Sequence, residues 1–277
     1  MRPFSSFVTA AIALAVLVFD RGHGAPVPWL YDVEVPVASQ STRERDRGAK
    51  TAFRVLLTRV TGLQSVPMSP KVRAALAAPE RYYVRYRFVE REASISESPE
   101  TDQDGEAAEE PQLFVRFSCD DIAVQELVRD AALPVWGSNR PRIAAWVVHD
   151  GPGAKAVLDP NDDLAVALTE HARNRGVPVE IPLMDLTDQM AVTPATIEGG
   201  FTELLLRAAR RYSADYVLVG TVASRPLGGY TAQWSLALPE QSVTFSFEAA
   251  DAPAVAERAI DAVADELMQR FAVFGAD

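Results

Sequence analysis

The feature that most constrains this fold is the continuous apolar run from Ile143 to Val148. Such a run is typical of a strand that is buried on both faces of a sheet, because a strand with one exposed face alternates apolar and polar residues. A short apolar segment, residues 133–136, and a cluster of turn formers, residues 137–141, come before it. We therefore predict that residues 137–141 are a hinge and that residues 142–277 form a second domain.

The first 24 residues are predicted to be a secretory signal peptide. Arg2 supplies a basic start, residues 7–19 are apolar but too few to span a bilayer, and residues 22–25 are mostly small and suit cleavage. We therefore expect an exported, periplasmic protein that touches the membrane only as the uncleaved precursor. Retention of this segment as an anchor is the alternative.

Residues 25–136 are predicted to form an α+β domain of the ferredoxin-like type, with the element order βααββαβ. Residues 29–37 alternate as a half-buried strand, with Trp29 on its apolar face. Ser41 and Gly62 are expected to begin and end the first helix. The other predicted strands are residues 81–91, 113–117 and 133–136, and the other helices are residues 69–78 and 120–131.

Residues 92–111 contain no Lys or Arg and at least seven acidic residues. A segment of this composition repels itself and buries little apolar surface, so we expect a disordered acidic loop between two strands. The whole chain has a formal net charge of −11. That charge disfavours phosphate backbones, and we predict that nucleic acid is not a partner.

The second domain is predicted to be α/β, with a mixed sheet and packed helices in the order βαβαβββα. The apolar run of residues 214–223 predicts another central strand, and two alternating strands follow it at 230–238 and 243–247. Asp251 is expected to begin a final amphipathic helix. The fold class is therefore α+β and α/β, in two domains.

Motifs of the common catalytic and metal sites are missing from the sequence. There is no H-E-x-x-H pattern, no G-x-S-x-G elbow and no Gly-rich phosphate loop, and Cys119 is the one cysteine. We therefore predict no catalytic residues, no metal and no cofactor.

Three ionisable side chains are nevertheless placed where predicted strands end. Asp185 and Asp188 follow residues 177–183, and His149 ends the strand that begins at Ile143. Together they can form a carboxylate pair with a base, which would suit a hydrolase or a metal-dependent enzyme. The alternative is structural, with both carboxylates capping a turn.

A second candidate site lies at the predicted hinge. Trp136, Asn139 and Arg140 surround a turn, and Trp146 follows in the next strand. Two indoles near a fixed guanidinium can line a ligand groove between domains. The alternative is that both indoles are core rings beneath the turn.

Several segments resemble the proteobacterial DUF2066 family of uncharacterised periplasmic proteins: Tyr31–Val37, Arg59–Gly62, Leu133–Gly137, Asn139–Pro141 and Ala214–Gly220. The second half is also similar to the small α/β domains of TolB amino-terminal, CsgG and LpoB-type envelope proteins. These resemblances imply an exported, non-catalytic module that binds or scaffolds another envelope protein. A hydrolase using Asp185, Asp188 and His149, and a periplasmic small-ligand receptor at the domain junction, are the alternative functions.

Overall fold

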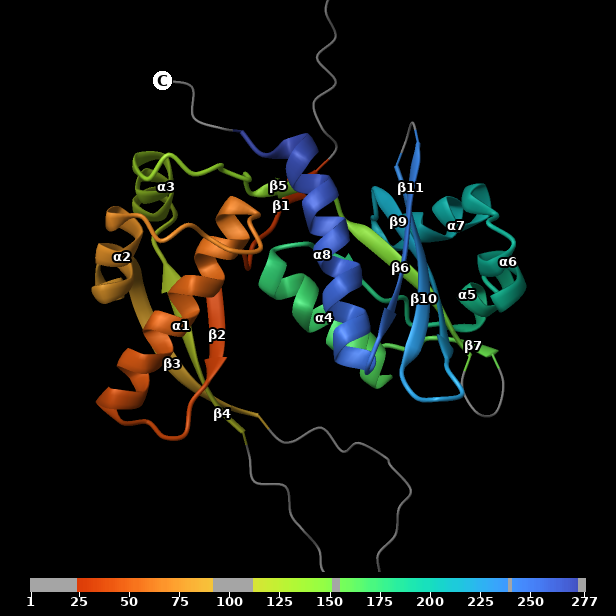
Figure 1. Cartoon of the computed structure of the whole chain (residues 1–277), viewed down its shortest axis with the longest axis horizontal. Coiled ribbons are helices and arrows are strands. Elements are labelled where there is room, and N and C mark those ends of the chain that lie inside the picture. The colour runs from red at the N-terminus through yellow and green to blue at the C-terminus, as the bar shows by residue number, and fades with distance from the viewer. Residues whose placement is uncertain (1–23, 92–111, 151–154, 239–240, 274–277) are drawn as a thin grey trace, which may run out of the picture.

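The computed structural model describes residues 24–91, 112–150, 155–238 and 241–273, and it confirms the predicted mixed α/β fold class. Two sheet-and-helix units lie side by side (Figure 1). The predicted signal peptide, apart from Gly24, and the predicted acidic loop lie outside the described residues. No helix among the residues described is long and apolar enough to cross a membrane.

The first unit is an antiparallel sheet of three described strands in the order β2-β4-β3, with helices on one face (Figure 1). Val33, Val115 and Phe117 point from the sheet into a core that the helices complete. The elements are β2 (Asp32–Pro36), α1 (Thr42–Thr61), α2 (Pro70–Ala77), the 3₁₀ turn η1 (Pro79–Arg81), β3 (Tyr83–Arg91), β4 (Gln112–Cys119) and α3 (Asp121–Asp130).

Helix α1 has the ends that the sequence predicted. The Ser41 side chain accepts a hydrogen bond from the backbone N–H of Glu44, at 3.3 Å. At the other end Gly62 has a left-handed backbone with φ of 72°, and its N–H donates to the carbonyl of Thr58. A side chain there would collide with Met268, so glycine is needed both for the conformation and for the close approach of the second unit.

The segment 133–136 is not a strand of the first sheet, in contrast to the prediction. Val135 forms an isolated bridge with Val273 from the end of the chain, and the N–H of Trp136 donates to the carbonyl of Val60. The backbone of this segment is therefore satisfied by the last turn of α1 and by the C-terminal end, which leaves β2 as an edge of its sheet. The first unit thus has a ferredoxin-like strand order without its last strand.

The second unit is a mixed sheet, and its described part has the strand order β11-β10-β9-β6-β7, with β8 also paired to β6. Strand β6 runs parallel to β9 and β8, and β9, β10 and β11 form an antiparallel meander. The elements are β6 (Ile143–Asp150), β7 (Lys155–Val157), α4 (Asp163–Arg175), β8 (Val179–Glu180), α5 (Leu186–Ala191), α6 (Pro194–Glu198), α7 (Thr202–Ala209), the 3₁₀ turn η2 (Arg210–Tyr212), β9 (Tyr216–Ser224), β10 (Tyr230–Ala237), β11 (Ser242–Ala249) and α8 (Ala252–Phe271).

Strand β6 is buried on both faces, as its apolar run predicted. Ile143, Ala145 and Val147 face α4 and α8, whereas Ala144 and Trp146 face the other way, towards α6 and α7. Residues 143–148 are all no more than 2% exposed. Each face of the central sheet therefore has its own core, and a residue's position along β6 determines which core it joins.

Hydrogen bonds hold the predicted hinge, residues 137–141, against both units. Ala25 and Pro26 form the short strand β1 (Ala25–Pro26), which pairs antiparallel with β5 (Asn139–Arg140). The Arg140 side chain is fully buried, and its guanidinium donates to four carbonyls: those of Gly137 (3.0 Å), Gly176 (2.6 Å), Arg59 (2.6 Å) and Trp136 (2.8 Å). Burial lowers the pKa of Arg140 to about 9, so it is still charged at neutral pH.

A second set of polar contacts joins the units along α4 and α8. Asp261 of α8 accepts hydrogen bonds from Gln64 of the first unit (2.5 Å) and contacts His171 of α4 at 3.0 Å. Arg175 of α4 is nearly buried and pairs with both Asp261 and Asp265. The carboxylate of Asp261 therefore ties the loop after α1 to two helices of the second unit.

We expect the substitution Arg140→Met to lower the free energy of unfolding by about 3 kcal/mol, because it leaves buried carbonyls of both units without a donor. Arg140→Lys should lose most of the same stability, since an ammonium cannot reach four separated carbonyls. Urea denaturation measures both. Arg54→Met, at an exposed position of α1, is the matched control and should change stability by less than about 0.5 kcal/mol.

Stability should fall in acid partly through Asp261. Burial raises its pKa, but the hydrogen bond with His171 and the charge of Arg175 outweigh burial and hold the pKa below its ordinary value. A carboxyl with a lowered folded-state pKa stabilises the fold above its unfolded pKa of about 4 and loses this as pH falls through the folded value. The free energy of unfolding of the Asp261→Asn protein should therefore fall less steeply in acid than that of the native protein. The exposed control Glu257→Gln should keep the native dependence on pH. The same acid dependence in both variants would contradict the assignment.

Candidate functional site

A cleft of about 350 Å³ opens where the N-terminal segment meets the second unit. One wall is the segment 26–29, and the other comes from α4, from residues 177–180 and from two positions beside the central sheet. This volume suits a small molecule. The lining residues are Pro26, Val27, Pro28, Trp29, Arg142, Thr169, Arg173, Val177, Pro178, Val179, Glu180 and Tyr212.

Trp29 is the aromatic side chain that the first unit contributes to the cleft. It lies in a turn before β2, where the N–H of Asp32 donates to its carbonyl at 3.1 Å. Its indole lies between two guanidinium groups, with Arg59 5.5 Å and Arg173 5.1 Å from the ring centroid. Arg59 is buried and donates to the carbonyl of Asp32, so the indole rests on a fixed support.

Two exposed arginines of the second unit line the opposite wall. Arg142 precedes β6, and its backbone N–H is held by the carboxylate of Asp215 at 2.9 Å. Arg173 is on the last turn of α4, and partial burial lowers its pKa. Within the described residues neither guanidinium forms an ion pair or donates a side-chain hydrogen bond, so both are open to an anionic group from solvent.

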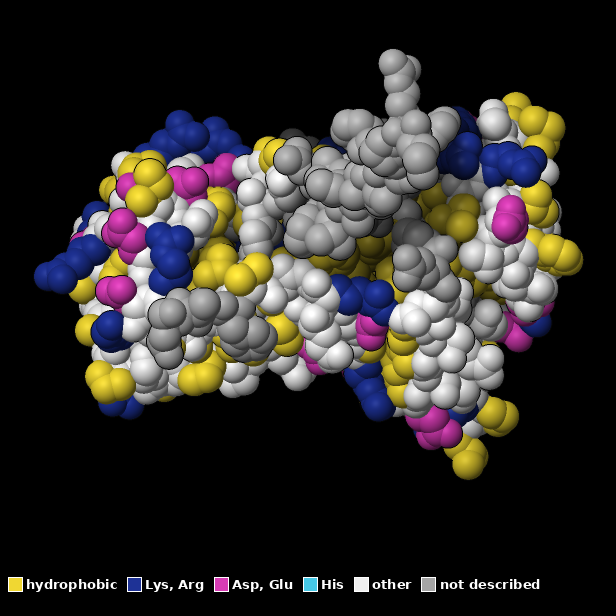
Figure 2. Space-filling model, turned by 90° about the horizontal axis from the view of Figure 1, so that it is seen from above, with side chains coloured by type: hydrophobic (Ala, Val, Ile, Leu, Met, Phe, Trp, Pro, Cys, Tyr) yellow, Lys and Arg dark blue, Asp and Glu magenta, His cyan; other side chains and the backbone are white. Residues whose placement is uncertain are grey.

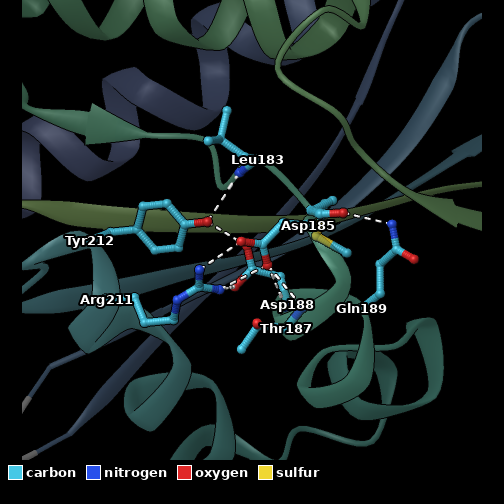
Figure 3. A network of polar contacts seen from close by, with 8 residues as sticks. Leu183, Asp185, Thr187, Asp188, Gln189, Arg211 and Tyr212 are labelled. Carbon is cyan, nitrogen blue, oxygen red and sulfur yellow. Dashed lines mark hydrogen bonds and ion pairs between the residues drawn. The ribbon is translucent and has the colours of Figure 1, made fainter.

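Tyr212 closes the cleft from the sheet side and is held by a buried carboxylate (Figure 3). Its hydroxyl donates to Asp188, which is 1% exposed, and accepts from the backbone N–H of Leu183 at 3.2 Å. Burial and the hydrogen bond to Asp188 raise the pKa of Tyr212 to about 12. The cleft therefore presents a neutral, fixed phenol ring rather than a group that exchanges protons.

Asp185 and Asp188, the predicted carboxylate pair, lie together on α5. Asp185 caps this short helix by accepting from the N–H groups of Thr187 and Asp188, at 2.9 and 3.0 Å. Arg211 bridges both carboxylates, at 2.7 Å from Asp185 and 2.6 Å from Asp188 (Figure 3). Its hydrogen bond holds the pKa of Asp185 well below the ordinary range. The pair therefore fastens α5 to the turn that carries Tyr212.

His149 is on the other face of the sheet from this pair. By strand alternation it shares the face of Val147, which packs on α4 and α8, and its ring is 5.9 Å from that of Tyr230. Tyr212 instead packs on Trp146, at 6.2 Å, on the opposite face. The structure therefore does not bring the three candidate side chains together. Among the residues described, no group of three or more Asp, Glu, His or Cys is placed to hold a metal.

Trp136, Asn139 and Arg140 do not line the cleft. Trp136 and Trp146 are 1% and 0% exposed, so both indoles are core rings, and Arg140 stacks on Trp136 with its Cζ 3.9 Å from the ring centroid. Asn139 is exposed and pairs in β5. The junction does carry a cleft, but the indole that lines it belongs to Trp29, and the guanidinium groups that line it belong to Arg142 and Arg173. The sequence signal for Trp29 was the prolines on its amino side, which favour a turn over the predicted strand.

Comparisons with known proteins assign no activity. The model of a domain of unknown function, DUF8605, matches residues 25–137, and no curated protein matches the chain. Solved structures with some similarity include the competence or damage-inducible protein of Enterobacter asburiae (TM-score 0.28, 15% identity, covering 47% of this chain and 87% of that one). Two others are CinA superfamily proteins, from Enterobacter cloacae (TM-score 0.28, 16%, 47% and 82%) and Escherichia coli (TM-score 0.29, 17%, 54% and 86%).

These findings correct the family expected from sequence. The matching family model, over residues 25–137, is DUF8605 and not DUF2066, and the solved structures named above are CinA-type proteins rather than the expected TolB, CsgG or LpoB-type proteins. The segments behind the expected resemblance are a strand, a helix end and an apolar run, which many α/β proteins need for the same physical reasons. The signal peptide and periplasmic location gain no support, since residues 1–23 lie outside the described residues.

We expect Tyr212→Phe to lower the free energy of unfolding by about 1 kcal/mol, because buried Asp188 loses one of its donors. Tyr86→Phe is the matched control: this residue is 42% exposed, and among the described residues its hydroxyl accepts a hydrogen bond only from the exposed Arg45 side chain. Chemical denaturation measures both variants. Equal stability of the two variants would show that the Asp188 network does not stabilise the fold.

Proposed function

We propose that this chain is a non-catalytic binding protein whose ligand is a small organic anion held in the interdomain cleft. The observation that carries the proposal is that two guanidinium groups without an ion pair among the described residues, Arg142 and Arg173, line a cleft of about 350 Å³ together with the indole of Trp29, on which Arg173 stacks. A guanidinium binds a carboxylate or phosphate through two parallel hydrogen bonds. The proline and valine side chains of the lining favour an apolar portion beside the anionic group.

The charge of the cleft supports an anionic ligand. Arg142 and Arg173 outweigh Glu180, the carboxylate among the lining residues. The chain as a whole is strongly acidic, so the positive lining is a local departure from the overall charge. Such a departure attracts an anion to one place on a surface that otherwise repels it.

The same geometry supports binding rather than catalysis. The carboxylates of Asp185 and Asp188, behind the cleft residue Tyr212, are occupied by Arg211 and Tyr212, and among the described residues they have no contact with His149. A general base must be within hydrogen-bond reach of the proton it takes. The predicted hydrolase set therefore has no shared place for a substrate, whereas the receptor alternative gains a cleft built from different residues. The exported location stays a prediction.

Phenyl phosphate and phenylacetate are suitable probes, with benzyl alcohol as the neutral control. Calorimetry should show binding of the two anions and none of the alcohol. Arg142→Gln and Arg173→Gln should each weaken binding about tenfold, by removing one charge-assisted pair. Arg54→Gln, an exposed arginine outside the cleft, should leave it unchanged.

Trp29 gives the same experiment an independent readout. The indoles of Trp136, Trp146 and Trp234 are at most 3% exposed, whereas Trp29 is partly exposed in the cleft. A bound anion should therefore protect a fraction of the tryptophan fluorescence from acrylamide, and Trp29→Phe should abolish that change. Equal binding of benzyl alcohol, or an equal loss in the Arg54→Gln protein, would contradict the proposal.

A second candidate function is scaffolding of another protein, and an exposed apolar cluster favours it. Leu186 and Met190 of α5 are 77% and 80% exposed, and Leu183 and Phe201 are 67% and 56% exposed. Figure 2 shows hydrophobic side chains at the end of the molecule where Figure 1 places α6. Exposed apolar clusters of this kind often mark protein contacts. A partner recovered with the native chain and lost with Leu186→Glu would support this role.

A further inference from the structure

The sheet of the first unit has one face that its helices leave open. Strand alternation places Val33, Val115 and Phe117 on the helix-covered face, so the residues between them point the other way. On the open face the strand register aligns Arg87 with Arg116 and Arg85 with Ser118. We use the term arginine face for the four arginines there, Arg85, Arg87, Arg91 and Arg116.

The arginine face carries more positive than negative charge. Arg91 and Arg116 share the carboxylate of Glu34. Arg85 donates to the hydroxyl of Ser118 at 3.1 Å, and Arg87 has no ion pair or hydrogen bond from its side chain to another described residue. A hollow of about 150 Å³ lies between these groups, lined by Asp32, Arg85, Tyr86, Arg87, Arg116 and Ser118. It is large enough for one carboxylate. Although Asp32 also lines it, Arg87 and the terminal Nη groups of Arg85, whose Nε is taken by Ser118, can donate to such a carboxylate.

The strand that carries Arg85 and Arg87 is also an edge of its sheet. In the described part of the chain β3 pairs with β4 on one side and with no strand on the other. Val84 is 70% exposed and Tyr86 is 42% exposed along it. An edge strand offers unpaired backbone groups with which an extended segment of another protein can pair.

We infer that the arginine face binds an acidic segment of a partner polypeptide that adds to β3 as an extra strand. Alternate residues of a strand are about 6.6 Å apart and point to one face. Acidic residues at alternate positions of the added strand therefore lie beside Arg85 and Arg87, and one carboxylate enters the hollow. The apolar residues between them lie on the other face, on the same side as Tyr86.

The open face favours an acidic polypeptide over single-stranded nucleic acid. Proteins that bind single strands on a sheet stack the bases on exposed aromatic rings. Here Phe114 points to the open face, and the guanidinium of Arg91 already lies over its ring at 4.9 Å. The face thus offers charge and an edge without an open stacking platform. The hollow of this face shares no lining residue with the cleft, and the inference does not depend on the function proposed there.

A fluorescein-labelled peptide of about nine residues that alternates glutamate and valine tests the inference by fluorescence anisotropy with the full chain. The double variant Arg85→Gln with Arg87→Gln should weaken binding about tenfold or more. It leaves the ion pairs of Glu34 intact, so it should fold, and circular dichroism checks this. Arg54→Gln and the cleft variant Arg142→Gln should bind the peptide like the native chain.

Two further probes make the result decisive. The same peptide with N-methyl groups on alternate residues cannot pair with the edge of β3, and it should lose binding although its charge is unchanged. An alternating lysine and valine peptide should not bind. Full retention of binding by the N-methylated peptide would overturn strand addition. Failure of the native chain to bind the acidic peptide at low salt, or tighter binding of an oligothymidylate that the double variant also loses, would overturn the inference.

Discussion

The arrangement of this molecule depends on one buried cation, the guanidinium of Arg140. Its donors reach the carbonyl of Arg59 in the last turn of α1 and that of Gly176 at the end of α4. Both carbonyls belong to helix C-termini, where the helix dipole is negative and backbone acceptors are otherwise unpaired. One positive charge therefore stabilises two helix ends from different units at once. Gly176 has no side chain because a Cβ there would collide with this guanidinium.

The cleft is a consequence of that join. Pairing of β1 with β5 places the segment 26–29 against the second unit, so that Trp29 of one unit and Arg142 and Arg173 of the other line the same cleft. The network of Asp185, Asp188 and Arg211 holds Tyr212 in position, and Tyr212 forms another part of the cleft wall. Both networks hold a turn in place as a wall of the cleft, which would lower the ordering cost of binding a ligand there.

Much of the fold could be predicted from local patterns. The apolar run at Ile143–Val148 identified the central strand, and Ser41 and Gly62 identified the ends of α1, because each depends on interactions within a few residues. The prediction for residues 133–136 failed for the opposite reason: Val135 pairs with Val273, and nothing near it in sequence signals that contact. The same contrast between local and distant interactions applies to the candidate site residues. Asp185 and Asp188 do lie together, since they are one helical turn apart, whereas the alternation of β6 sends His149 to the other face.

By itself the sequence determined the fold class, the central strand and most helix boundaries, since apolar periodicity and capping residues act over short distances. It also placed a candidate site at the junction of the two units, but the indole and the guanidinium that it named there, Trp136 and Arg140, are buried and do not line the cleft. Only the tertiary structure decided that Arg140 is buried as a structural cation and that Arg173 stacks on Trp29 at the cleft. Which of several arginines is buried and which is free depends on carbonyls and rings supplied by residues far away in the chain, and no local pattern records them.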